Sequence, residues 1–170
     1  MESGKITSLL AGIITIIATY VFSWYTMDIP PNIPPTFYSN GLGIINNIPS
    51  MFTNASALGI LLGMPGFAVY IVAGFLIFFL ASGIIQIIGI KSRAVAIVGS
   101  LMPIGLGIAL FFTSGNILDR IIWIENVFGT NSPLGIFPLQ IVPNEIVDIG
   151  GYLLLIGGGL GIVSVFLPRD

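Results

Sequence analysis

Residues 66–113 read GFAVYIVAGFLIFFLASGIIQIIGIKSRAVAIVGSLMPIGLGIALFFT, two long apolar runs interrupted by the tripeptide Lys91-Ser92-Arg93. Each run can cross the roughly 30 Å hydrocarbon core of a bilayer, because a helix needs about 20 residues to do so. The basic tripeptide between them leaves room only for a tight reversal. The stretch therefore predicts two antiparallel membrane-spanning helices, at 66–90 and 94–113.

Two further runs, at residues 6–25 and 150–167, have the same character and contain no charged side chain. Charged residues make up only 7% of the chain and hydrophobic residues 55%, whereas soluble domains carry about 25% charged residues. The first run lacks the small-residue cleavage site of a signal peptide, so it is expected to remain as a span. The predicted fold class is an all-α membrane protein, a single domain (1–170) built as a four-helix bundle.

The distribution of basic residues predicts the orientation. Lys5, Lys91, Arg93 and Arg169 fall on one side of the predicted spans, and Arg120 falls on the other. Cytoplasmic loops are enriched in Lys and Arg. Both termini are therefore predicted to be cytoplasmic in the cell membrane, with two loops, about 26–65 and 114–149, outside.

Three aromatic residues, Trp24, Tyr25 and Tyr152, fall near the predicted outer ends of the spans. Such rings favour the membrane interface, so they are expected to lie there. The topology resembles that of claudins and related tetraspan proteins. However, the chain has no Cys and therefore lacks the Trp and Cys pattern of a claudin first loop, so no family follows from this likeness.

The two outer loops are predicted to form a small, partly β layer. Short strands are expected at 36–38 and 41–45, and an edge strand at 134–142, because β-favouring residues there are bounded by turn residues. Helices are expected at 55–63 and 117–128. The acidic residues on this side are expected to form a solvated surface, since their spacing fits no calcium-binding loop: Asp119, Glu125, Glu145 and Asp148.

Small and polar side chains recur on one face of three of the predicted spans. The members are Ser8, Gly12, Thr15 and Thr19 in the first span, Gly99, Pro103 and Gly107 in the third, and Gly157 and Gly161 in the fourth. A hydroxyl-lined pathway for water, ions or a small solute is one interpretation. Close helix packing is the favoured one, because small residues let membrane helices approach each other. The Gly157-x-x-x-Gly161 motif has the same meaning, with a partner helix in this chain or in a neighbouring subunit.

Two single residues complete the candidate sites. Gln86 is the most polar residue within a predicted span, so it is expected to point into the bundle and form an interhelical hydrogen bond. Asn54-Ala55-Ser56 is a glycosylation sequon in the first outer loop, which is the side where glycosylation occurs.

The missing residue types narrow the function. The chain has no Cys and no His, which excludes thiol chemistry and the common haem, zinc and nucleophile arrangements. Proton-coupled transport requires an ionisable group within the membrane, and no charged residue lies within the predicted spans. We therefore expect no enzyme activity, no cofactor and no metal. The formal net charge of -2 is too small to imply a nucleic-acid partner, so none is expected.

Two functions remain after these exclusions. The first is a non-catalytic accessory or scaffold subunit of a larger membrane complex, for instance an energy-converting one, with other membrane subunits as partners. The second is a self-associating surface or envelope protein that contacts copies of itself. A pore-forming protein is a more distant alternative.

Overall fold

The computed structural model describes residues 2–27, 37–112, 124–128 and 147–169. Within these ranges, four helices are long and apolar enough to cross a membrane: α1 (Ser3–Tyr20), α4 (Gly66–Ile88), α5 (Arg93–Phe112) and α7 (Ile149–Phe166). The prediction of a membrane protein with four spanning helices is confirmed by their length and composition.

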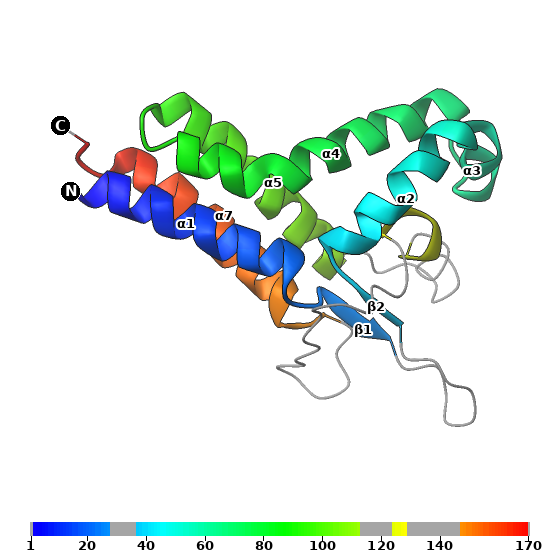
Figure 1. Cartoon of the computed structure of the whole chain (residues 1–170), viewed down its shortest axis with the longest axis horizontal. Helices are drawn as coiled ribbons and strands as arrows, with labels where there is room; N and C mark the ends of the chain where they lie inside the picture. The colour runs from blue at the N-terminus through cyan, green and yellow to red at the C-terminus, as the bar shows by residue number, and fades with distance from the viewer. Residues whose placement is uncertain (1, 28–36, 113–123, 129–146, 170) are drawn as a thin grey trace.

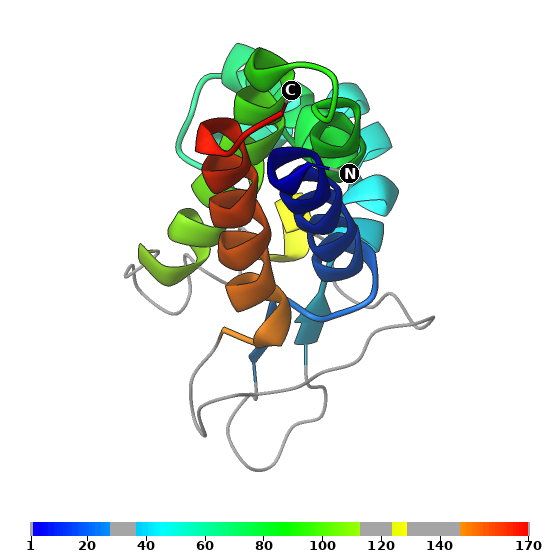
Figure 2. The same cartoon turned by 90° about the vertical axis from the view of Figure 1, so that its left-hand side faces the viewer.

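The four spans pack as a closed series of neighbours. α1 lies against α7, α7 against α5, α5 against α4, and α4 returns to α1. The two ends of the chain lie at the same end of the bundle as the turn between α4 and α5 (Figure 1). Figure 2, viewed from that end, shows α1 and α7 side by side. This arrangement brings the small-residue faces of the spans into the interior.

The end of α1 differs from the prediction, because the helix stops at Tyr20 and not at Tyr25. The chain then enters β1 (Tyr25–Met27), which pairs antiparallel with β2 (Phe37–Ser39). Residues 21–25 are apolar enough to continue a span, but they are needed to reach this strand pair.

The predicted partly β outer layer is not supported. The strand expected at 41–45 is wrong, because α2 (Gly41–Thr53) begins there and α3 (Ala55–Leu61) follows it. Asn40 starts α2: its Oδ1 accepts a hydrogen bond from Leu42 N at 2.9 Å, and its Nδ2 donates to Tyr20 O at 3.1 Å. The strand expected at 36–38 falls largely on β2, and the one at 134–142 lies outside the described residues.

A sharp corner separates α3 from α4. Gly63 adopts a positive φ of 68°, which a glycine tolerates at a helix end. Met64 N donates to Gly59 O at 2.8 Å, and Pro65 then precedes α4. Of the helix expected at 117–128, only η1 (Ile124–Phe128) is described, a π-helical turn that packs on α2.

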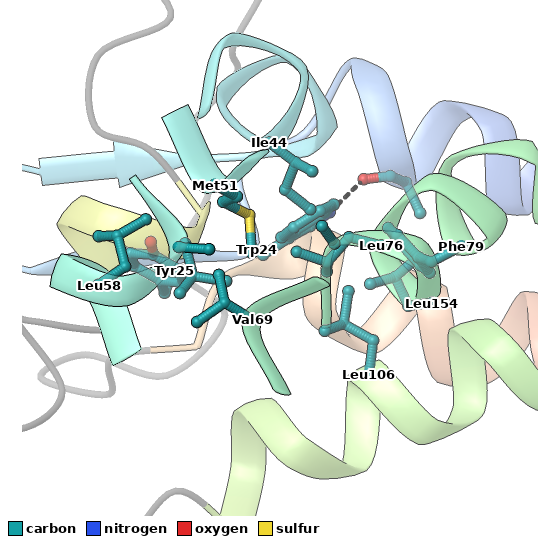
Figure 3. Close-up of a cluster of buried hydrophobic side chains, with 14 residues drawn as sticks. Trp24, Tyr25, Ile44, Met51, Leu58, Val69, Leu76, Phe79, Leu106 and Leu154 are labelled. Atoms are coloured by element: carbon teal, nitrogen blue, oxygen red, sulfur yellow. Dashed lines mark hydrogen bonds between the residues drawn. The ribbon is translucent and has the colours of Figure 1, made fainter. Parts of the chain in front are cut away.

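A buried cluster around Trp24 joins the outer segments to the spans (Figure 3). Trp24 is 0% exposed, and its Nε1 donates to Ala18 O at 2.8 Å. Its ring meets Phe79 of α4 edge-on, with 5.4 Å between centroids. Tyr25 is 2% exposed, so neither residue lies at a lipid interface as their position in the sequence predicts. Both side chains are buried because the outer segments pack around the end of α1.

Candidate functional site

The Gln86 side chain joins three of the spans. It lies on α4, is fully buried, and its Oε1 accepts a hydrogen bond from Thr15 Oγ1 of α1 at 2.8 Å. Its Nε2 donates to Ser100 Oγ of α5 at 3.3 Å, and that hydroxyl donates to Ala96 O at 2.6 Å. A buried amide is costly unless its polar atoms are hydrogen-bonded. Gln86 therefore fixes the positions of α1, α4 and α5 along the bundle axis relative to one another.

The small and polar stripe of α1 faces its helix neighbours. Its members Ser8, Gly12, Thr15 and Thr19 are all buried. Ser8 Oγ donates to the backbone oxygen of Gln86 at 2.8 Å. A Cβ atom added at Gly12 would lie 2.7 Å from Gly83 O, so the backbones of α1 and α4 are in close contact. The glycine makes this approach possible.

The two glycines of the Gly157-x-x-x-Gly161 motif pack on different helices of the same chain. A Cβ added at Gly157 would collide with Thr15 Oγ1 and would lie 3.1 Å from Thr15 N in the α1 backbone. One added at Gly161 would collide with Ser100 Oγ of α5, and would lie 3.2 Å from Gln86 Nε2. The motif thus seats α7 in the groove between α1 and α5.

The expected positions on α5 lie at its contacts with α4 and α7. A Cβ added at Gly99 would lie 2.9 Å from Gln86 N, and one added at Gly107 would lie 2.6 Å from Leu155 Cδ2. Pro103 is buried within the helix. Proline has no N–H to donate to the carbonyl four residues earlier, so it weakens the helix ladder at Gly99 O.

Two glycines that complete this interface escaped the sequence prediction. Gly83 of α4 meets the backbone of Gly12, and Gly158 of α7 meets the backbone of Ser100. Gly83 lies three residues before Gln86 and Gly158 directly follows Gly157, so closeness to residues of the interface is the signal that could have found them.

Asp148 corrects the prediction of a solvated acidic surface, because it is 0% exposed. Ser23 Oγ hydrogen-bonds to its Oδ2, and its backbone N donates to Trp24 O at 2.8 Å. Val147 forms a β-bridge with Tyr25 of β1, and α7 begins directly after Asp148, so this residue lies beside the start of the strand. The other acidic side chains of that prediction, Asp119, Glu125 and Glu145, lie outside the description.

Asn54 lies at the junction between α2 and α3 and is exposed. Its backbone N donates to Ser50 O at 2.8 Å and its backbone oxygen accepts from Leu58 N at 2.9 Å, so its main chain joins the two helices. Glycosylation at this residue stays a prediction.

The chemistry available at the helix interface is that of neutral hydrogen-bonding groups. Hydroxyls and an amide can hold helices in register, but they carry no charge to move at neutral pH. Within the described ranges, no three His, Cys, Asp or Glu residues are grouped so that they could hold a metal ion. Comparisons of the chain with protein-family models, with curated proteins and with solved structures find no match.

Proposed function

We propose that the chain is a non-catalytic accessory or scaffold subunit of a larger membrane complex. The main support is an exposed apolar surface on α4 that has a glycine at its centre, where another helix could pack closely. We call this surface the α4 face; its members are Phe67, Tyr70, Ile71, Gly74, Phe75, Ile77 and Phe78.

The α4 face lies on the N-terminal half of α4, which diverges from α1 and α7. Tyr20, the last residue of α1, donates from Oη to Leu80 O at 2.8 Å, so residues 66–79 extend beyond this contact. Figure 1 shows this half of α4 running with α2 and α3 away from α1 and α7. α2 and α3 also pack against this half of α4, and the Phe52 ring of α2 reaches the α4 face at Tyr70. The large side chains of the α4 face are each 39–66% exposed in the part of the chain that the structure describes.

Gly74 forms a gap in the middle of the α4 face. Large side chains surround it at positions three and four residues away, which are Tyr70, Ile71, Ile77 and Phe78. A Cβ atom added at Gly74 would meet nothing within 4 Å. Glycine in a helix costs about 0.5–1 kcal/mol relative to alanine. Contact with a second helix can offset this cost, because the small residue lets the backbone of that helix approach and a side chain of it enter the gap.

The apolar surface continues onto the neighbouring helices. Ile60 of α3 is 84% exposed, and the Phe52 ring of α2 lies 5.8 Å from the Tyr70 ring. Contiguous exposed apolar patches usually mark a site of interaction with another protein or with a membrane. The patch extends past the end of α1, so a protein partner that also projects beyond the bundle fits it better than lipid alone.

We infer that the termini are cytoplasmic and that α2 and α3 lie on the outer side. Lys5, Lys91, Arg93 and Arg169 lie at the end of the bundle that carries both termini and the α4–α5 turn. Cytoplasmic ends of spans are enriched in such residues. This orientation places the exposed Asn54 outside, where a glycan can be attached.

A non-catalytic role is supported by the way the buried polar groups are used. The Gln86 amide, the Thr15 hydroxyl and the Ser100 hydroxyl bind one another across three helices. Groups engaged in this way stabilise the bundle and are not free to act on a substrate. Nucleophilic catalysis would in addition need an activated nucleophile beside a base.

The substitution Gly74→Leu tests the proposal. A leucine would fill the hole, and overpacking a tight contact costs about 1–3 kcal/mol, so we expect partner chains to be retained about tenfold less in mild detergent. The melting temperature of the isolated chain should not fall, since no atom of the described residues lies within 4 Å of a Cβ added there. Quantitative immunoprecipitation from native membranes measures the retention.

Gly105→Leu is the matched control. Gly105 lies on the exposed side of α5, and a Cβ added there also meets nothing within 4 Å. We expect it to leave retention unchanged. Equal retention in both variants and the parent would show that the α4 face faces lipid. Loss of contacts only between copies of this chain would instead favour the self-associating alternative.

A further inference from the structure

Four of the five basic residues of the chain gather around one hollow at the end of the bundle. The hollow has a volume of about 570 Å³ and is lined by Lys5, Ile90, Lys91, Arg93 and Arg169. These residues come from the start of α1, the α4–α5 turn, the first residue of α5 and the segment after α7. The walls therefore come from α1, α5 and the segments that directly follow α4 and α7.

Arg169 forms a fixed wall of the hollow. Its Nη1 donates to Gly89 O at 2.6 Å, its Nη2 to Ser164 Oγ at 2.8 Å, and its Nε to Ser164 O at 3.1 Å. Gly4 N also donates to Pro168 O at 2.9 Å, which holds this segment against α1. The acceptors of the guanidinium are neutral, so its positive charge is positioned but not neutralised by them.

Among the described residues, the charge of the hollow is only partly balanced. Glu2 pairs with Lys5, with 3.0 Å between Oε2 and Nζ, and Asp170 lies outside the described residues. Lys91 and Arg93 are exposed. Burial, and next repulsion by the charge of Arg93, lower the pKa of Arg169. An anion between them would relieve this repulsion.

The surroundings favour an anion that belongs to the membrane. α5 begins at Arg93, and the N–H groups of a helix N-terminus add partial positive charge. The hollow lies at the ends of apolar spans, which is the level of lipid headgroups. At the same ends of the spans, Ile88, the last residue of α4, is 56% exposed and Phe166, the last residue of α7, is 83% exposed, and both are suited to acyl chains.

We propose that this hollow binds the phosphate group of an anionic membrane phospholipid. Basic pockets between the ends of membrane helices are known to bind such headgroups. The proposal does not depend on the accessory-subunit function, because it concerns a different end of the molecule and a different ligand.

The test uses the full-length chain in two kinds of nanodisc. One contains phosphatidylcholine alone, and the other contains phosphatidylcholine with about 20% phosphatidylglycerol. We expect phosphatidylglycerol to raise the melting temperature and to remain bound in native mass spectrometry. Arg93→Gln should weaken its retention about fivefold, and Lys91→Gln with Arg93→Gln about thirtyfold, since each basic group contributes separately. Both side chains are exposed, so the variants should melt like the parent in phosphatidylcholine.

Arg120→Gln removes an equal charge from the connection between α5 and α7 and should leave retention unchanged. Retention that is the same for both lipids, or that Arg120→Gln lowers as much as Arg93→Gln, would overturn the site. Inorganic phosphate added at millimolar concentration is the second arm. If it displaces the lipid or raises the melting temperature as strongly, the ligand is a soluble phosphate and the lipid assignment is wrong.

Discussion

Gly161→Leu should lower the free energy of unfolding by roughly 2–6 kcal/mol, the sum of overpacking a tight contact and of breaking a buried hydrogen bond. A Cβ at this position already collides with Ser100 Oγ and lies 3.2 Å from Gln86 Nε2. A leucine would push α7 away from α5 and separate the Gln86 amide from Ser100. Thermal melting in detergent, followed by circular dichroism, measures the loss.

Gly159→Leu is the control on the same helix. Its Cβ would meet nothing within 4 Å, so the same change should leave the melting temperature close to that of the parent. Equal melting of the two variants would mean that Gly161 does not face α5, and the seating of α7 between two helices would be wrong.

Trp24→Ala should destabilise the chain by about 3–5 kcal/mol, the usual cost of removing a large aromatic side chain from a core. The indole is fully buried, contacts Phe79 of α4 edge-on, and lies 6.4 Å from the Phe128 ring of η1. Its hydrogen bond to Ala18 O is lost as well. We expect α2 and η1 to loosen before the spans separate, and limited proteolysis should then cut the outer segments first.

Phe166→Ala provides the comparison for an exposed aromatic residue, since Phe166 is 83% exposed. It should change the melting temperature and the proteolysis pattern little. If Trp24→Ala is no more destabilising than this, Trp24 lies at the lipid interface after all and the cluster in Figure 3 does not hold the outer segments.

The four spans could be predicted from the sequence because only a long apolar helix is stable across the hydrocarbon core, and long apolar runs are easily recognised. The outer segments could not. Residues 41–45 are apolar and rich in glycine, which local preference assigns poorly to a helix. A Cβ at Gly41 would collide with Thr19, so contact with α1 requires the glycine, and the Asn40 cap then starts the helix.

The candidate site shows the same division. The periodicity of Ser8, Gly12 and Thr15 predicts that they share a face, because positions on a helix follow from its pitch. Their partners depend on the heights and rotations of other helices, which no local pattern contains. Thus Thr15 binds Gln86, which is 71 positions away, and the two glycines of one motif contact different helices. The predictions that Trp24 lies at the membrane interface and that Asp148 is solvated were wrong for a related reason, because both side chains are buried by residues distant in the sequence.

The central claim is that this chain works as a subunit, and the mass of its native assembly tests it most directly. Extraction from native membranes in a mild detergent, followed by native mass spectrometry, gives the composition and the ratio of chains. We expect the chain at a fixed ratio to unlike membrane subunits, with the unlike chains lost when Gly74 is replaced by leucine. A chain that migrates alone, or only with copies of itself, would contradict the accessory-subunit function.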